Sequence, residues 1–88
     1  MDNLTIMFSF GGNKISLQCQ KNEKIEEVFK RFCAKAQLNY NDVKFYYNST
    51  EFNVWGKTLE QLGLANFFTF EVVNDKTLRG AKSSLIIN

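Results

Sequence analysis

Histidine is absent from this 88-residue sequence, and cysteine occurs only twice, at Cys19 and Cys33. Without histidine the commonest general base is missing, and neither thiol has an imidazole partner. Two cysteines alone do not make a zinc site, which needs four ligands. Gly11-Gly12 has the pattern of a turn rather than of a phosphate-binding loop. We therefore expect no enzyme activity, no catalytic residue, no metal site and no cofactor.

Neither sign of charge dominates, since 11 Lys and Arg face 9 Asp and Glu for a net charge of +2. Such a balance gives no strong attraction to nucleic acid or anionic lipid. No apolar run approaches membrane-spanning length, and Met1 to Ile6 lacks the basic region and apolar stretch of a secretory leader. We expect a monomer in the cytoplasm, the nucleus or both, with reduced thiols and with neither nucleic acid nor membrane as a partner.

Alternating apolar and polar residues predict strands with one buried face. The pattern occurs at Leu4–Phe10, Ile15–Gln20, Val43–Tyr47 and Phe68–Val73, with a short strand starting at Glu51-Phe52. Gly11-Gly12-Asn13 joins the first two strands as a hairpin, and Asn48-Ser49-Thr50 is a second turn. In the third strand the alternation turns Val43, Phe45 and Tyr47 inward.

One amphipathic helix is predicted between the second and third strands. Its apolar residues recur at spacings of three and four, namely Ile25, Val28, Phe29, Phe32, Cys33 and Ala36. Asn22 is the expected N-cap, and the helix should end near Gln37. A single helical turn is predicted later in the chain, with Thr58 as N-cap, Gln61 as capping-box partner and Gly63 as terminator.

A chain of this length holds one core. Because the periodicity fades from Asn74 onward, we assign residues 1–74 to one domain and expect residues 75–88 to form a flexible tail. The apolar Leu85-Ile86-Ile87 in that tail has no explanation from the sequence.

Three segments between Leu4 and Val73 resemble ubiquitin and its relatives in order and spacing. They are Lys24-Ile25-Glu26-Glu27-Val28 at the start of the helix, Val43-Lys44-Phe45-Tyr46-Tyr47 in the third strand, and Thr58-Leu59-Glu60-Gln61-Leu62-Gly63-Leu64 before the last strand. The resemblance implies an α+β fold of the ubiquitin-like β-grasp type. Such a fold has a mixed four- to five-stranded sheet with one main helix packed across it.

The sequence also departs from ubiquitin. It has no proline, whereas ubiquitin carries a proline pair where Asn39-Tyr40 stands. Thr50 occupies the place of the best-known chain-forming lysine, and no Gly-Gly ends the domain. The missing Gly-Gly favours a non-catalytic domain that binds other proteins. The alternative is a modifier conjugated to proteins after processing at Gly80, which Leu78-Arg79-Gly80 suggests. A Ras-association type of domain is a third option, but it would require a basic strand edge that the sequence does not show.

An exposed patch on the sheet is the first candidate binding site. The resemblance implies that the third and last strands are neighbours, so that Lys44, Tyr46, Glu71 and Val73 share the outer face with Phe10 or Gly11 at its rim. It also implies that partners are ubiquitin-receptor-like or ubiquitin-pathway proteins. Tyr46 stands where ubiquitin has an exposed isoleucine, and Glu71 replaces a histidine. Tyrosine is enriched at binding hot spots, yet strand propensity alone also explains an exposed tyrosine, and both interpretations stay open.

A groove between the Ile15–Gln20 strand and the helix is the second candidate. The resemblance to SUMO-like proteins implies that an extended peptide adds there as a strand. Lys30, Arg31 and Lys35 would then attract its acidic flanks, although the polar outer face of the strand makes this site the weaker one. Trp55 is either a binding anchor or a cap over the core.

Overall fold

A computed structural model describes residues 3–74 of the chain. In chain order the elements are β1 (Asn3–Phe10), β2 (Asn13–Gln20), α1 (Ile25–Ala36), the 3₁₀ helix η1 (Tyr40–Asp42), β3 (Val43–Tyr47), β4 (Thr50–Glu51), α2 (Leu59–Leu62) and β5 (Phe68–Asn74). The predicted tail, with Gly80 and Leu85-Ile86-Ile87, lies outside the described residues.

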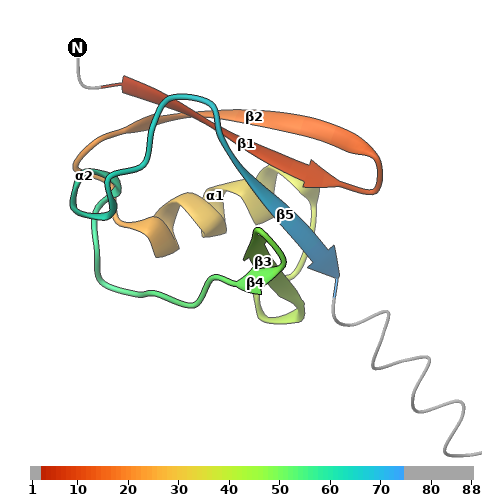
Figure 1. Cartoon of the computed structure of the whole chain (residues 1–88). Helices are drawn as coiled ribbons and strands as arrows, with labels where there is room; N and C mark the ends of the chain where they lie inside the picture. The colour runs from red at the N-terminus through yellow and green to blue at the C-terminus, as the bar shows by residue number, and fades with distance from the viewer. Residues whose placement is uncertain (1–2, 75–88) are drawn as a thin grey trace, which may run out of the picture.

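The five strands form one sheet in the order β2-β1-β5-β3-β4. β1 and β5 are parallel neighbours at its centre, and the other pairs are antiparallel. The helix α1 crosses one face of this sheet, and α2 lies beyond the start of α1 (Figure 1). The predicted mixed sheet with one main helix is therefore confirmed, and β3 and β5 are neighbours as expected.

Two tight turns set the strand register. Gly11 and Gly12 have φ of 57° and 83°, and they close the β1–β2 hairpin at the pair Phe10–Asn13. Asn48 and Ser49 have φ of 51° and 64°, so they form the left-handed type of turn that suits a two-residue hairpin loop. Thr50, which the sequence placed in this turn, belongs to β4 instead.

The helix α1 buries the predicted apolar face, with Ala36 at its half-buried end. It ends as expected, since Gln37 adopts the left-handed conformation of a C-cap. The predicted N-cap is wrong, because the helix begins after Lys24 and has no side-chain cap. The amide of Ile25 donates instead to the carbonyl oxygen of Lys57 at 2.9 Å. A distant backbone group therefore satisfies the helix terminus that Asn22 was expected to cap.

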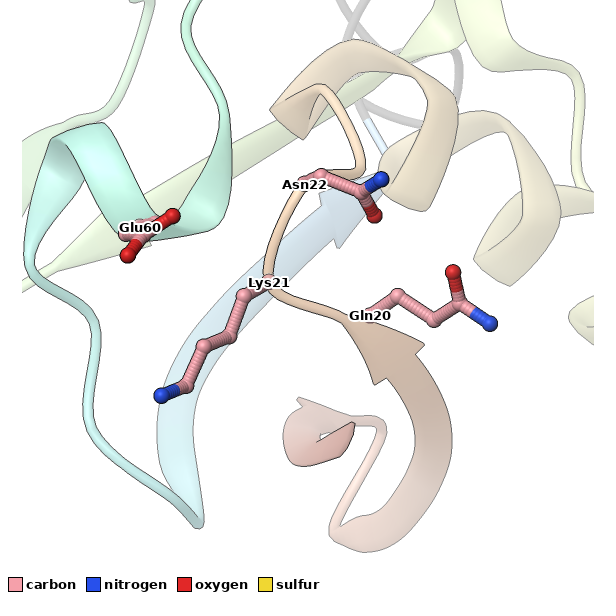
Figure 2. A pocket seen from close by; sticks show the side chains of 4 residues that line it. All are labelled: Gln20, Lys21, Asn22 and Glu60. Atoms are coloured by element: carbon pink, nitrogen blue, oxygen red, sulfur yellow. The ribbon is translucent and has the colours of Figure 1, made fainter. Parts of the chain in front are cut away.

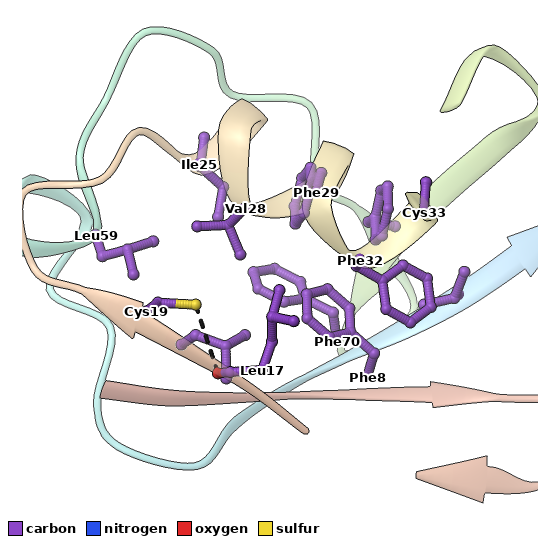
Figure 3. Packing of buried hydrophobic residues seen from close by; sticks show 13 residues of the cluster. Phe8, Leu17, Cys19, Ile25, Val28, Phe29, Phe32, Cys33, Leu59 and Phe70 are labelled. Carbon is purple, nitrogen blue, oxygen red and sulfur yellow. Dashed lines mark hydrogen bonds between the residues drawn. The ribbon is translucent and has the colours of Figure 1, made fainter. Parts of the chain in front are cut away.

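The core between α1 and the sheet is rich in phenylalanine (Figure 3). Phe8 of β1 stacks on Phe32 of α1 with ring centroids 4.3 Å apart, and Phe29 stacks on Phe45 of β3 at 3.8 Å. Phe70 of β5 meets Phe29 edge-on at 5.1 Å. Aromatic pairs of this kind add stability beyond the area that they bury. These pairs hold α1 against β1, β3 and β5.

The short helix α2 has the predicted capping box. The Gln61 amide donates to Thr58 Oγ1 at 3.1 Å, while the Thr58 amide donates to Gln61 Oε1 at 2.9 Å, and Gly63 is the left-handed C-cap. The amides of Leu59 and Glu60 donate to carbonyl oxygens in the turn that follows β2. These bonds hold α2 against the start of α1.

Tyr47 does not behave as an interior residue, contrary to the sequence prediction. It is 44% exposed, and its ring stacks at 4.5 Å on that of Phe68, which is itself half-buried. Tyr47 is the last residue of β3, and its ladder partner Thr50 belongs to a strand of only two residues. Tyr47 thus continues the alternation of β3, but it lies beyond the part of the sheet that is buried.

Candidate protein-binding face

The face of the sheet turned away from α1 is the candidate site, and we call it the outer sheet face. Alternation opposite to the buried positions of each strand defines its members. We restrict the name to the part around β5, which consists of Met7 and Ser9 of β1, Lys44 and Tyr46 of β3, Glu51 of β4, and Thr69, Glu71 and Val73 of β5. Glu51 and Glu71 are exposed and the other members are half-buried. No helix covers this side of the sheet in the part of the chain that the structure describes (Figure 1).

The strand register shows which of these residues are neighbours. Glu71 lies directly between Ser9 of β1 and Tyr46 of β3. Tyr46 in turn lies between Glu71 and Glu51 of β4. Lys44 is opposite Val73, one step further along β3, so Tyr46 and Val73 are diagonal rather than direct neighbours. The structure thus brings together four predicted site residues and places a carboxylate at the centre of the face.

Phe10 is not part of the outer sheet face. It is half-buried and packs against the core, on the same side of β1 as Ile6 and Phe8. The period-two pattern of β1 dictates this orientation. The strand therefore points Phe10 away from Tyr46, and its predicted place at the rim of the patch is wrong.

Met7 also belongs to this face, although it was not among the predicted site residues. It lies on β1 opposite Thr69 of β5, one diagonal step from Glu71. Met7 lies between the buried Ile6 and Phe8 in an alternating strand, so the sequence pattern indicated that its side chain points outward. With Tyr46 and Val73, Met7 supplies the apolar surface around the central carboxylate.

Ion pairs do not neutralise the two carboxylates of this face. The ion pairs formed among residues 3–74 are Lys30–Glu27, at 3.9 Å within α1, and Arg31–Glu23, at 2.9 Å between α1 and the turn before it. Neither Glu51 nor Glu71 takes part in them. The outer sheet face thus has two carboxylates open to a partner.

The groove beside β2 is occupied by the protein's own side chains. β2 is an edge strand, and Arg31 Nη2 donates to the carbonyl oxygen of Gln18 at 3.0 Å while Lys35 Nζ donates to that of Ser16 at 2.9 Å. The Glu23 carboxylate accepts from the amide of Gln20 at 3.0 Å and pairs with both Nε and Nη2 of Arg31. Two of the three cations expected to attract a peptide therefore cover the strand edge on which that peptide would add.

Comparison with solved structures identifies the fold. The chain is similar to the ubiquitin of Caldiarchaeum subterraneum, with TM-score 0.71 and 23% identity over 82% of this chain and 92% of that one. The chain has the ubiquitin-like β-grasp fold. It is also similar to the ubiquitin-like domain of an Arabidopsis thaliana protein, with TM-score 0.72 and 12% identity over 85% and 80% of the two chains.

A third similar structure comes from work on molecular mimicry of SUMO that promotes DNA repair, with TM-score 0.69 and 11% identity over 83% of this chain and 92% of that one. No protein-family profile matches the chain, and no curated protein sequence matches it. The ubiquitin-like fold is thus shared by a ubiquitin, a domain of another protein and a structure from work on SUMO mimicry.

Neither thiol of this ubiquitin-like domain is poised to react. Cys19 and Cys33 are free cysteines, each 2% exposed. Burial raises the pKa of Cys33 to about 11, and burial also raises the pKa of Cys19 even though the Arg31 charge opposes the shift. The Cys19 thiol donates to the carbonyl oxygen of Leu17 at 3.5 Å (Figure 3). Because the thiolate is the nucleophile, both groups are inert near neutral pH.

A pocket of about 220 Å³ lies where the β2–α1 turn of the ubiquitin-like domain meets α2 (Figure 2). Its lining consists of the polar side chains Gln20, Lys21, Asn22 and Glu60. Ligand pockets are usually larger and have mostly apolar walls. Within residues 3–74, no group of three His, Cys, Asp or Glu is placed to hold a metal ion. No helix of the described part has both the length and the apolar character to cross a bilayer.

Trp55 of the ubiquitin-like domain lies over the end of the core rather than inside it. Its ring is 54% exposed and meets Phe29 and Tyr40 edge-on, with centroids 6.4 Å away in each case. The Gly56 amide donates to Glu26 Oε1 at 2.8 Å, and this bond lowers the pKa of that carboxyl. The loop is thus fixed to α1 beside Trp55.

Proposed function

We propose that this ubiquitin-like chain is a non-catalytic domain that binds other proteins through its outer sheet face. The observation that carries the proposal is the position of Tyr46. It lies half-buried between Glu71 and Glu51, diagonal to Val73, on the side of the sheet opposite α1. Tyrosine combines a wide apolar ring with a hydroxyl that stays at the wet rim of an interface.

Two further observations support this site over the others. The edge of β2, where an extended peptide would add, is covered by Arg31 and Lys35. The thiols are buried and protonated near neutral pH, which leaves them without a part in catalysis. The proposed partners are proteins, with ubiquitin-receptor-like or ubiquitin-pathway proteins as the first class to examine, and the domain acts as a monomer inside the cell.

Paired tyrosine variants test the proposal. Tyr46→Ala removes the ring from the outer sheet face, whereas Tyr47→Ala removes the next ring of the same strand from the opposite side. In an affinity capture with quantitative mass spectrometry, the partners of the wild-type chain should be lost from Tyr46→Ala and kept by Tyr47→Ala. Thermal unfolding of both variants checks the fold. Retention of the same partners by a folded Tyr46→Ala chain would rule out this face.

Conjugation to other proteins is the second candidate function, and Leu78-Arg79-Gly80 is the observation that favours it. Only a terminal glycine carboxylate could be activated, so processing would have to remove residues 81–88. Intact-mass measurement after incubation with ATP and a lysate of the source cells tests this function. A conjugated modifier should lose residues 81–88 and appear in higher-mass adducts. An unchanged mass would exclude it.

A further inference from the structure

We propose that the outer sheet face selects a basic protein segment whose anchor is an arginine, with its guanidinium over the Tyr46 ring and between the Glu51 and Glu71 carboxylates. The inference rests on the proposed function, because it names the chemistry of the partner that the same face accepts.

The central place of Glu71 is the first reason. Ser9 and Tyr46 flank it across the neighbouring strands, and Thr69 and Val73 flank it along β5. A protein that covers Tyr46 and Val73 therefore also removes the Glu71 carboxylate from water. Burial of an ionised carboxylate without a partner is strongly unfavourable. A partner that fits this face must bring a cation to its centre.

The protein's own cations do not fill this role. Glu71 takes part in no ion pair among residues 3–74, although Lys44 lies one diagonal step away and Lys14 is opposite Ser9 on β2. On the other side of Tyr46, Glu51 likewise takes no part in an ion pair. Tyr46 is thus an aromatic ring with an unneutralised carboxylate on each side.

Arginine matches this arrangement better than lysine. Side chains directly opposite each other in an antiparallel ladder have Cβ atoms roughly 4.5–5.5 Å apart, so both carboxylates lie within reach of a group centred on the Tyr46 ring. A guanidinium stacks on an aromatic face and donates its hydrogen bonds in a fork, whereas an ammonium is a compact point charge. One arginine can therefore contact the ring and a carboxylate together.

Three synthetic peptides test the inference, identical except at one repeated position that holds Arg, Lys or Glu. Each is titrated into the ¹⁵N-labelled full chain and followed by amide chemical shifts. The Arg peptide should shift Tyr46, Glu51 and Glu71, bind about two- to fivefold more tightly than the Lys peptide, and weaken as salt increases. The Glu peptide should leave the outer sheet face unchanged.

Two variants make the test specific. Glu71→Gln keeps the shape of the side chain and should weaken the Arg peptide by about threefold. A double change, Glu51→Lys with Glu71→Lys, should reverse the preference so that the Glu peptide binds and the Arg peptide does not. The amide spectrum of each variant alone shows whether it is folded, and Glu71→Gln remains informative if the double variant is not.

The two proposals fail in different ways. Equal shifts of the outer sheet face by the Arg and Glu peptides, or no shift of this face by the Arg peptide, would overturn the arginine inference. The proposed function would still stand if Tyr46→Ala loses the captured partners. Partner capture that survives Tyr46→Ala in a folded chain would overturn the proposed function itself.

Discussion

The ring of Phe29 on α1 lies nearly parallel to the ring of Phe45 on β3, with centroids 3.8 Å apart and an interplanar angle of 5°. Phe29 has no exposed surface, and Phe45 is 3% exposed. Phe29 also meets Phe8, Phe52 and Phe70 edge-on. One helical residue thus packs against the strands on both sides of β5 as well as against β5 itself.

Phe29→Ala should lower the free energy of unfolding by about 3–5 kcal/mol, since it removes a large buried side chain and leaves a cavity. That is a large part of the roughly 5–15 kcal/mol typical of a folded domain. Urea unfolding followed by far-ultraviolet circular dichroism measures the change. Phe67→Ala is the matched control, because the Phe67 ring is 63% exposed. Equal stability of the two variants would contradict the central role of Phe29.

The edge of β2 supports a second prediction. Arg31→Ala with Lys35→Ala removes the two side chains that donate to the carbonyl oxygens of Gln18 and Ser16. An edge strand without such cover is a template for pairing with another chain. The double variant should therefore associate with itself as its concentration rises, which sedimentation velocity measures.

Lys24→Ala with Lys30→Ala is the control, since it makes the same change in charge and leaves the two donors to the Gln18 and Ser16 carbonyl oxygens in place. Lys30 pairs with Glu27 and lies over the Tyr40 ring. The control should sediment like the wild-type chain. Identical sedimentation of the two double variants would show that Arg31 and Lys35 do not protect the edge.

Much of the fold follows from periodicity in the sequence. The alternation in β1, β3 and β5 and the three-four spacing in α1 each report which side chains face a core. The capping box of Thr58 and Gln61 was predictable because its hydrogen bonds join residues three positions apart. Contacts of short range leave local signals that a single sequence displays.

The missed features depend on contacts between distant segments. Lys57 supplies the carbonyl oxygen that replaces a side-chain cap for α1, and η1, β3 and β4 separate this residue from the helix along the chain. Arg31 and Lys35 were expected to attract an acidic peptide beside β2, but they donate to the carbonyl oxygens of Gln18 and Ser16 instead. The position of Glu71 between Ser9 and Tyr46 needed the strand order as well as the alternation.

The buried thiols predict how stability depends on pH. Burial raises the pKa of Cys33 from an ordinary value of 9.0 to about 11, so the unfolded chain loses this proton before the folded chain does. The stabilising effect is complete below pH 9, and the free energy of unfolding should fall as pH rises from about 9 to about 11. The decline from this one group is at most ~1.4 kcal/mol per pH unit.

Urea unfolding of the wild-type chain and of Cys33→Ala at a series of pH values measures this decline. The variant should be less stable at every pH below 9, but its stability should change less between pH 9 and pH 11. Both chains share the same tyrosines and lysines, so the difference between the two curves isolates Cys33. Parallel curves would mean that the thiol is not protected in the folded state.

Phe67 carries the last prediction, because its φ of 66° is a left-handed conformation that is strained for a bulky side chain. Its amide donates to the carbonyl oxygen of Thr5 at 2.6 Å, which fixes the backbone there. Glycine adopts this conformation without a Cβ clash, whereas alanine keeps the strain of roughly 1–2 kcal/mol. Phe67→Gly should therefore be more stable than Phe67→Ala by about 1 kcal/mol in urea unfolding. The two variants lack the same ring, so a more stable Phe67→Ala would show that the backbone at this position is not left-handed.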